Sequence, residues 1–110
     1  SSFFEAQRAL MDHRGIKELI GDRSVVDSEL GKYVTIGEDC TIEEDCEISD
    51  SIIFDGVEID EGCVIEDSII GYDVIIDKEV VIKNGIISDN LYIEEGMEHV
   101  ETKLKPESVE

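Results

Sequence analysis

The chain has 110 residues, and its 29 Asp and Glu against 9 Lys and Arg give a formal net charge of −20. This length fits one domain or a piece of a longer chain, and so acidic a surface argues against binding to nucleic-acid phosphates. Because the sequence has no run of 18 apolar residues and no basic-then-apolar leader, we expect no membrane span, no signal peptide and a cytoplasmic location.

The first element that the sequence predicts is an amphipathic helix over residues 2–12, SFFEAQRALMD. Phe3, Ala6 and Leu10 lie along one side at three- and four-residue spacing. Gly15 ends or breaks the helix before a short IKELI segment, and we assign residues 1–22 to this helical segment. We expect it to cap the open end of the structure that follows. Its two phenylalanines also indicate a further packing partner.

From Leu30 onward the chain contains an internal repeat of apolar anchors. The steps between anchors are six residues, except for steps of five after Ile48, Ile65 and Ile82. Three steps therefore make one period, after which the pattern returns to the same register. Every anchor after the first is isoleucine: Leu30, Ile36, Ile42, Ile48, Ile53, Ile59, Ile65, Ile70, Ile76, Ile82, Ile87 and Ile93.

Two further columns of the repeat describe the corners of a coil. The residues two before the anchors are small or β-branched apart from the last, and should point inward beside their anchors: Val34, Cys40, Cys46, Ser51, Val57, Cys63, Ser68, Val74, Val80, Gly85 and Leu91. The residues three after the anchors that begin six-residue steps are mostly Gly, Asn or Asp, which tolerate left-handed backbone: Asp39, Asp45, Gly56, Gly62, Asp73, Glu79, Asn90 and Gly96. Glu79 breaks this pattern, as does Tyr33 in the first coil.

Short strands with a turn about every six residues and three faces per coil predict an all-β solenoid. We expect a single-stranded parallel β-helix of about four coils over residues 23–99, with a triangular section and strands about 4.8 Å apart between coils. His99 stands where an anchor is expected and is interpreted as the end of the ladder. Residues 100–110, VETKLKPESVE, lose the repeat and are expected to form a mobile tail.

The six-residue step resembles the hexapeptide repeat of left-handed parallel β-helices, [LIV]-G-x-x-[STAV]-x. Ile36-Gly37 with Cys40, and Ile70-Gly71 with Val74, are most similar to it. The left-handedness of the helix is implied by this resemblance, since the usual crossover rule favours right-handed connections.

A helix reading S-F-F-E-A-Q-R-A-L followed by coils reading I-x-x-S-I-I resembles the sugar-1-phosphate nucleotidylyltransferases, over about residues 1–99. In that family an N-terminal Rossmann-like domain, which uses Mg²⁺, joins a nucleotide to a sugar 1-phosphate and releases pyrophosphate. The family's G-x-G-T-R-L loop and W-x-D-x-G-T segment are absent from this chain. We therefore assign no catalytic, cofactor-binding or metal-ligating residue to it. The resemblance implies a C-terminal oligomerisation or regulatory domain that contacts its own catalytic domain and forms homo-oligomers through β-helix faces.

Two alternatives remain open. One is a fragment of a hexapeptide acyltransferase, but such enzymes need a catalytic histidine near a projecting loop. His13 and His99 lie at opposite ends of this sequence, and no loop interrupts the repeat between Ile36 and Ile93. The other is a purely structural interaction domain with no enzyme parent, against which the helix with its phenylalanines weighs.

The three cysteines form no C-x-x-C pair and accompany only two histidines, so we do not expect a zinc site. Cys46 and Cys63 occupy the same repeat position one period apart, so they should stack in adjacent coils, within the Cα separation of a disulfide. Reduced, buried thiols are the favoured interpretation in a cytoplasmic protein.

Four acidic residues share the repeat position just after an anchor: Glu43, Asp60, Asp77 and Glu94. They predict a vertical ladder of carboxylates whose neighbours repel each other by about 1 kcal/mol in water. The hypothesis that follows is adaptation to a high-salt cytoplasm or weak cation binding.

Overall fold

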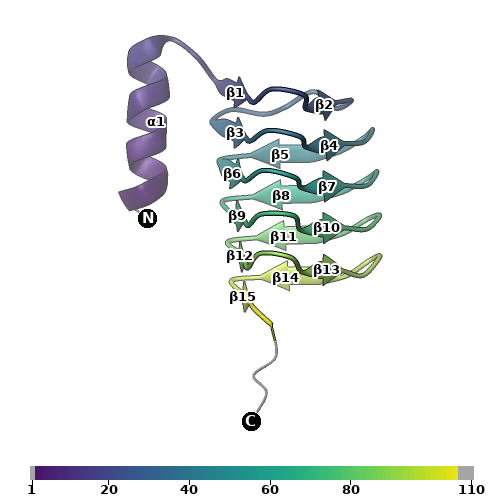
Figure 1. Ribbon diagram of the computed structural model, residues 1–110. Coiled ribbons are helices and arrows are strands. Elements are labelled where there is room, and N and C mark those ends of the chain that lie inside the picture. Colours follow the sequence, from purple (N-terminus) through teal and green to yellow (C-terminus); the bar gives the residue numbers. More distant parts are fainter. Residues whose placement is uncertain (1, 107–110) are drawn as a thin grey trace.

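The structure, a computed structural model, describes the backbone of residues 2–106 and the side chains of residues 4–106. It is a parallel β-solenoid preceded by one helix, α1 (Ser2–Arg14), as Figure 1 shows. One of its sheets has five strands, so the chain completes about five turns, where the repeat had indicated about four. The expectation of an all-β solenoid with an N-terminal helix is confirmed.

Three parallel sheets form the three faces of the solenoid. Sheet A has six strands: β1 (Glu18–Ile20), β3 (Val34–Ile36), β6 (Ser51–Ile53), β9 (Ile69–Ile70), β12 (Ile86–Ile87) and β15 (Lys103–Leu104). Sheet B has five: β2 (Val25–Val26), β4 (Thr41–Ile42), β7 (Glu58–Ile59), β10 (Ile75–Ile76) and β13 (Tyr92–Ile93). Sheet C has four: β5 (Glu47–Ser49), β8 (Val64–Glu66), β11 (Val81–Lys83) and β14 (Glu98–Val100).

The pairing register places the isoleucine anchors in vertical columns. Ile53 pairs with Ile70, and Ile70 with Ile87, each one period further along the chain. The same period aligns Ile48 with Ile65 on sheet C. Because in-register parallel strands place identical positions on the same face, one inward column runs along each sheet.

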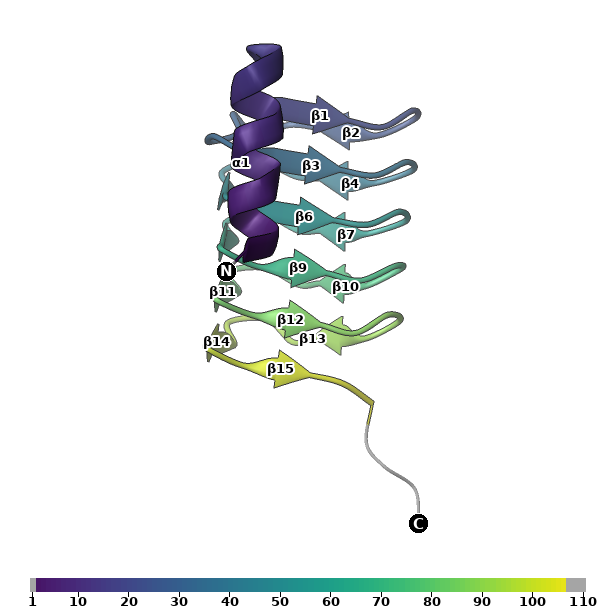
Figure 2. The same cartoon turned by 90° about the vertical axis from the view of Figure 1, so that its left-hand side faces the viewer.

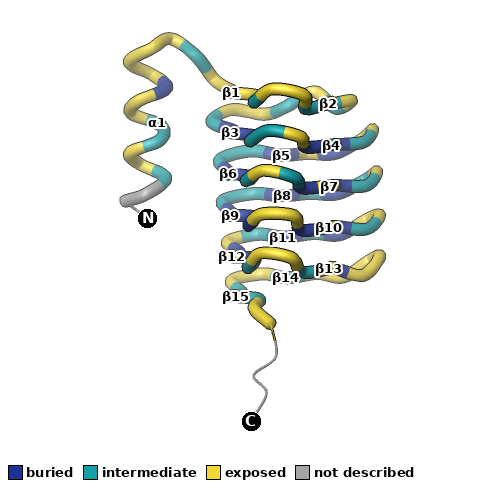
Figure 3. The backbone as a smooth tube through the Cα atoms, in the orientation of Figure 1, coloured by how far each residue is buried: buried dark blue, intermediate teal, exposed yellow. Residues whose placement is uncertain are grey.

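These columns make up the core, which Figure 3 shows as dark blue segments on the strands. The anchors from Ile36 to Ile93 are at most 5% exposed. The residues two positions before them are buried as well, including Ser51 and Ser68 in the corners, except that Leu91 in the last coil is partly buried. The Ser68 hydroxyl donates to the carbonyl of Glu66 and accepts the N–H of Gly85, so its polar group stays paired in the core.

The corners adopt left-handed backbone at the predicted turn positions. Glu79 (φ 58°) and Tyr33 (φ 63°), which broke the Gly, Asn and Asp pattern, adopt it too. A third corner, at the five-residue step, does the same at Asp50, Asp67 and Asn84. The geometry of the solenoid therefore imposes the turn even on residues that disfavour it.

Helix α1 does not cap the open end of the solenoid, so that expectation is wrong. It lies along sheet A in front of β1, β3 and β6, with its N-terminal end beside β9 (Figure 2). Met11 on its inner side is only 2% exposed. The side chain of Phe3 lies outside the described residues, as do residues 107–110.

The solenoid extends further at both ends than the repeat indicated. Strand β1 begins at Glu18, inside the segment assigned to the helix. It pairs with β3, with Glu18 opposite Val34, so this first coil is one residue shorter than the period of the repeat. At the other end β15 pairs with β12 within the expected tail. His99 lies opposite Ile82 in the last strand of sheet C, but the ladder continues beyond it, because Leu104 pairs with Ile87 and packs against the core. No helix among residues 2–106 is long and apolar enough to cross a membrane.

Candidate functional site

Sheet A carries an apolar column on its outer surface. Side chains alternate between the two faces of a strand, so the residue just before each inward anchor points outward. On sheet A these residues are paired in register and include three consecutive isoleucines: Leu19, Thr35, Ile52, Ile69, Ile86 and Lys103. Leu19 and Ile86 remain 42% and 45% exposed.

The outer surfaces of the other two sheets are more polar. On sheet B the corresponding column contains Glu58 beside Ile75. On sheet C it contains two valines between two glutamates: Glu47, Val64, Val81 and Glu98. Contiguous apolar surface on a monomer usually marks an interaction site, whereas single exposed apolar residues do not. Sheet A is therefore the face that calls for a functional explanation.

Helix α1 stands over the upper part of this face and leaves an apolar groove of about 260 Å³ between itself and the sheet. The groove is lined by side chains of both elements and of the segment that joins them: Ala6, Gln7, Leu10, Met11, Arg14, Ile16, Leu19, Thr35 and Ile52. Leu10 is 49% exposed at its edge. The apolar surface of the groove thus continues onto the isoleucine column below it.

Polar contacts fix α1 in this position. Gln7 donates from Nε2 to the carbonyl of Tyr33 at 2.9 Å, and its Oε1 accepts from the Thr35 hydroxyl at 2.6 Å. Arg8 reaches the corner between sheets C and A, where its Nε lies 2.7 Å from Asp50 Oδ1 and its Nη2 lies 3.5 Å from Asp67 Oδ1. The hydrogen bond to Asp50 raises the pKa of Arg8 above its ordinary value.

A second cluster holds the C-terminal end of α1. The carboxylate of Asp12 accepts from Lys17 Nζ at 3.0 Å and from the Tyr33 hydroxyl at 2.8 Å. The bond from Lys17, followed by that from Tyr33, lowers the pKa of Asp12. The ammonium of Lys17 also lies 4.7 Å from the centre of the Tyr33 ring. The helix is thus anchored at both ends of the groove.

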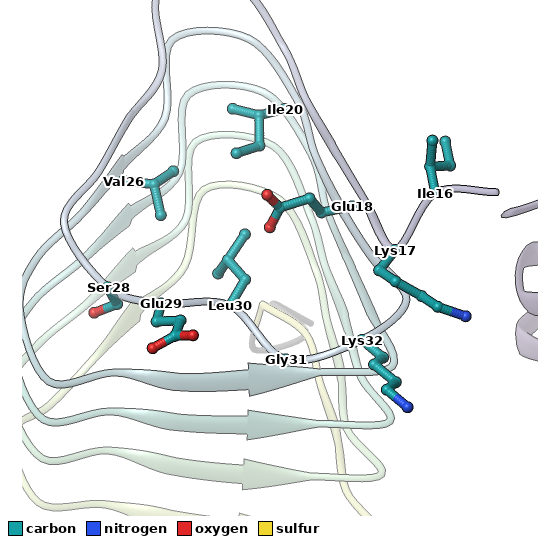
Figure 4. Close-up of a pocket in the computed structure, with 10 residues that line it drawn as sticks. All are labelled: Ile16, Lys17, Glu18, Ile20, Val26, Ser28, Glu29, Leu30, Gly31 and Lys32. Atoms are coloured by element: carbon teal, nitrogen blue, oxygen red, sulfur yellow. The ribbon is translucent and has the colours of Figure 1, made fainter.

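The first coil leaves the end of the solenoid open, as the close-up in Figure 4 shows. Ile20, Val26 and Leu30 point into the triangular opening there. Ile20 is 44% exposed, because no further coil stacks above β1 and β2. The opening is a second surface with apolar side chains, at the end of the solenoid and bordered by charged residues such as Glu18 and Glu29.

Residues considered for chemistry do not converge. His13 is in α1, and His99 is in β14 at the far end of the solenoid (Figure 1). Among residues 4–106 no group of three or more His, Cys, Asp or Glu side chains is arranged to hold a metal ion. All three cysteines are buried and unbridged. Cys46 and Cys63 stack as the repeat indicates, whereas Cys40 lies in another column.

The carboxylate ladder lies between sheets B and C. Its residues follow the paired anchors Ile42, Ile59, Ile76 and Ile93, so they stack from coil to coil. Asp77 accepts from the Tyr92 hydroxyl at 2.5 Å and from the N–H of Lys78 at 2.8 Å, which lowers its pKa.

Sequence reasoning missed the outer isoleucine column, although its signal is in the sequence. Ile52, Ile69 and Ile86 each precede an anchor and recur once in every period. An outward position should not favour an apolar residue in three successive coils unless something covers it. The repeat of inward anchors accounts for the second isoleucine of each I-I pair and assigns no role to the first.

Comparison with known proteins agrees with the fold. No curated protein matches the chain. A family model described as the EIF2B subunit epsilon LbH domain, where LbH denotes a left-handed β-helix of the hexapeptide-repeat type, matches residues 11–99. This match covers most of the chain and includes the end of α1 and the coils as far as β14. The chain therefore belongs to the family of left-handed β-helix domains represented by the epsilon subunit of EIF2B.

Proposed function

We propose that this chain is a non-catalytic interaction domain that docks a nucleotidyltransferase-type catalytic domain through the face formed by α1 and sheet A. The apolar outer column of sheet A is the observation that supports this proposal. This column and the groove beneath α1 form one continuous surface, and the exposed side chains of Leu10, Leu19 and Ile86 lie along it.

The position of α1 supports the choice of partner. Its N-terminal end lies beside β9, on the same face as the isoleucine column (Figure 2). A domain joined to that end would start within reach of Ile69 and Ile86 and needs no long linker. The sequence resemblance implies a catalytic domain at this position, with a reaction that joins an NTP to a sugar 1-phosphate.

The net charge of −20 also bears on the alternative that two copies pair through this face. Bringing two such surfaces together costs electrostatic energy that a less acidic partner does not impose. Docking of a different domain is therefore favoured over self-association.

Two isoleucines with nearly equal exposure give a matched test. Ile86 on sheet A is 45% exposed and Ile75 on sheet B is 44% exposed. In the full-length polypeptide that carries this domain, Ile86→Asp places a charge in the docking surface, and Ile75→Asp places the same charge on another face. The connection between the two domains is then cleaved, and size-exclusion chromatography shows whether they stay together. The domains should separate in the Ile86→Asp variant and stay associated in the Ile75→Asp variant.

Equal behaviour of the two variants would overturn sheet A as the docking face. The chain alone, studied by sedimentation, should be a monomer, and a stable dimer disrupted by Ile86→Asp would assign the face to self-association instead. Pyrophosphate release from NTP and sugar 1-phosphate should occur with the full-length polypeptide and not with the isolated chain. No such activity in the full-length polypeptide would refute the proposed reaction.

A further inference from the structure

One corner of the solenoid contains an asparagine followed by a glycine. Asn84 lies between β11 and β12 and is exposed, whereas Gly85 after it is buried. In such a pair the backbone nitrogen of the glycine can attack the side-chain amide carbon of the asparagine, because glycine has no Cβ atom to block the approach. The other asparagine of the chain, Asn90, precedes a leucine, whose side chain hinders this attack.

Packing requires the glycine of this pair, but the backbone does not require the asparagine. A Cβ atom on Gly85 would lie 2.6 Å from Cγ2 of Ile82, closer than two carbon atoms pack without a bond. Asn84 has φ 53°, and Asp50 and Asp67 adopt the same left-handed backbone at this corner of the two preceding coils. An aspartate would therefore fit the corner equally well and would lack the reactive amide.

In the folded chain a hydrogen bond holds the glycine nitrogen back from this reaction. The N–H of Gly85 donates to the hydroxyl of Ser68 at 3.0 Å. Ser68 is fully buried, and its hydroxyl donates in turn to the carbonyl of Glu66 at 2.7 Å. The nitrogen must lose its proton to hydroxide before it attacks, and a buried N–H that is already bonded meets no hydroxide until the corner opens.

We propose that Asn84 is a site of spontaneous deamidation, which the Ser68 hydroxyl protects and which reacts when this corner opens. The nitrogen of Gly85 gives its proton to hydroxide and bonds to Cγ of Asn84. The side-chain nitrogen leaves as ammonia, and a five-membered succinimide ring remains. Water then adds to either ring carbonyl and breaks its C–N bond, so the product is aspartate or isoaspartate. The net change is the gain of one water and the loss of one ammonia.

The corner lies near the C-terminal end of the stack, where opening is easiest. After β12 only β15 adds to sheet A (Figure 1). Stacked coils separate one by one from an end, so coils near an end open more often than those in the middle. Loss of β15 breaks the bond from the N–H of Ile86 to the carbonyl of Thr102, and separation of the next coil then frees the N–H of Gly85.

Isoaspartate at this position would deform sheet A. It carries the main chain through the former side chain and so adds one backbone atom between β11 and β12. Two bonds fix the length of the corner: the N–H of Asn84 donates to the carbonyl of Glu66 at 3.0 Å, and the carbonyl of Gly85 accepts from Ile69 at 2.9 Å. The longer chain cannot keep both bonds, so Ile86 would leave the outer column.

The test incubates the chain at neutral pH and follows its peptides over time by mass spectrometry, with fragmentation that distinguishes isoaspartate from aspartate. Asn84 should convert readily in the chain unfolded by urea and slowly in the folded chain. Asn90 should stay intact over the same time in both samples, and it serves as the internal reference.

Two serine variants test the protecting bond. Ser68→Ala leaves the buried N–H of Gly85 without its partner, which should raise the rate in the folded chain about fivefold or more. Ser51→Ala is the matched control, because the Ser51 hydroxyl accepts the N–H of Ser68 one coil earlier and does not contact Gly85. It should leave the rate at Asn84 near that of the wild type. Circular dichroism checks the fold of both variants.

Equal rates in the folded and unfolded wild type would overturn the protection, and an intact Asn84 in the unfolded chain would overturn the site. Equal acceleration by Ser51→Ala and Ser68→Ala would point to general loosening and contradict the role of Ser68. Hydrogen exchange at Gly85 needs no variant: it should be slow in the folded wild type, and exchange as fast as in the unfolded chain would contradict the proposal. These results are independent of whether sheet A docks a second domain.

Discussion

Ile65 tests whether the anchor columns hold the solenoid together. It is fully buried in β8, in the middle of the stack, with Ile48 one coil above and Ile82 one coil below. Ile65→Ala removes three carbon groups, which at about 0.8 kcal/mol for each buried methylene costs about 2.4 kcal/mol. The neighbouring anchors are fixed by backbone pairing and cannot fill the space, so the cavity raises the expected loss to about 4 kcal/mol.

The assay is urea unfolding followed by circular dichroism, with Ile75→Ala as the control. Ile75 points outward from β10 and is 44% exposed, so its truncation should cost less than about 1 kcal/mol. A solenoid can unfold coil by coil from its ends. A central position is chosen because unfolding of the end coils does not remove the cavity there. Equal transition midpoints for the two variants would refute the role assigned to the anchor columns.

Three further predictions concern the corners and the charges. Glu79→Gly should raise the free energy of unfolding by about 0.5 to 1 kcal/mol, because Glu79 has a left-handed backbone (φ 58°) that glycine adopts without strain. Glycine already occupies the equivalent positions one coil away, at Gly62 and Gly96. A lower urea midpoint for the variant than for the wild type would count against this prediction. Raising KCl from low to molar concentration should raise the melting temperature, since salt screens the stacked carboxylates, and an unchanged melting temperature would contradict the repulsive ladder. An NMR titration of Asp12 should give a midpoint below that of an ordinary aspartate, because Lys17 and Tyr33 bond its ionised form, and Tyr33→Phe should move the midpoint upward. The contribution of Asp12 to stability is then complete above about pH 3.9, the unfolded value, and is lost as the pH falls through the lower folded pKa; a midpoint unaffected by Tyr33→Phe would contradict this.

The inward anchors and corner residues could be predicted from sequence because one physical requirement repeats every coil. An isoleucine such as Ile70 must point inward, and a small residue such as Ser68 must fit beside it at the corner. The first coil escaped prediction because it is one residue shorter than the others and its inward residue on sheet B is Val26. A single irregular coil has no periodicity of its own, and only its pairing with β3 and β4 identifies it.

The position of α1 could not be predicted from the helix sequence. Its apolar side fits an open solenoid end as well as the side of a sheet. What decides between them is a set of contacts between residues far apart in sequence, such as Arg8 with Asp50 and Gln7 with Thr35. The docking face depends on that placement, so the outer isoleucines gain their meaning only once α1 is seen beside them.

Hydroxyl-radical footprinting is the most direct test of sheet A as the docking face. It compares the solvent accessibility of individual side chains between the isolated chain and the full-length polypeptide. We predict that Leu10, Leu19 and Ile86 become protected in the full-length polypeptide, while Ile75 and Tyr92 on sheet B keep their rates. Unchanged rates on sheet A, or protection confined to sheet B, would contradict the proposed docking face.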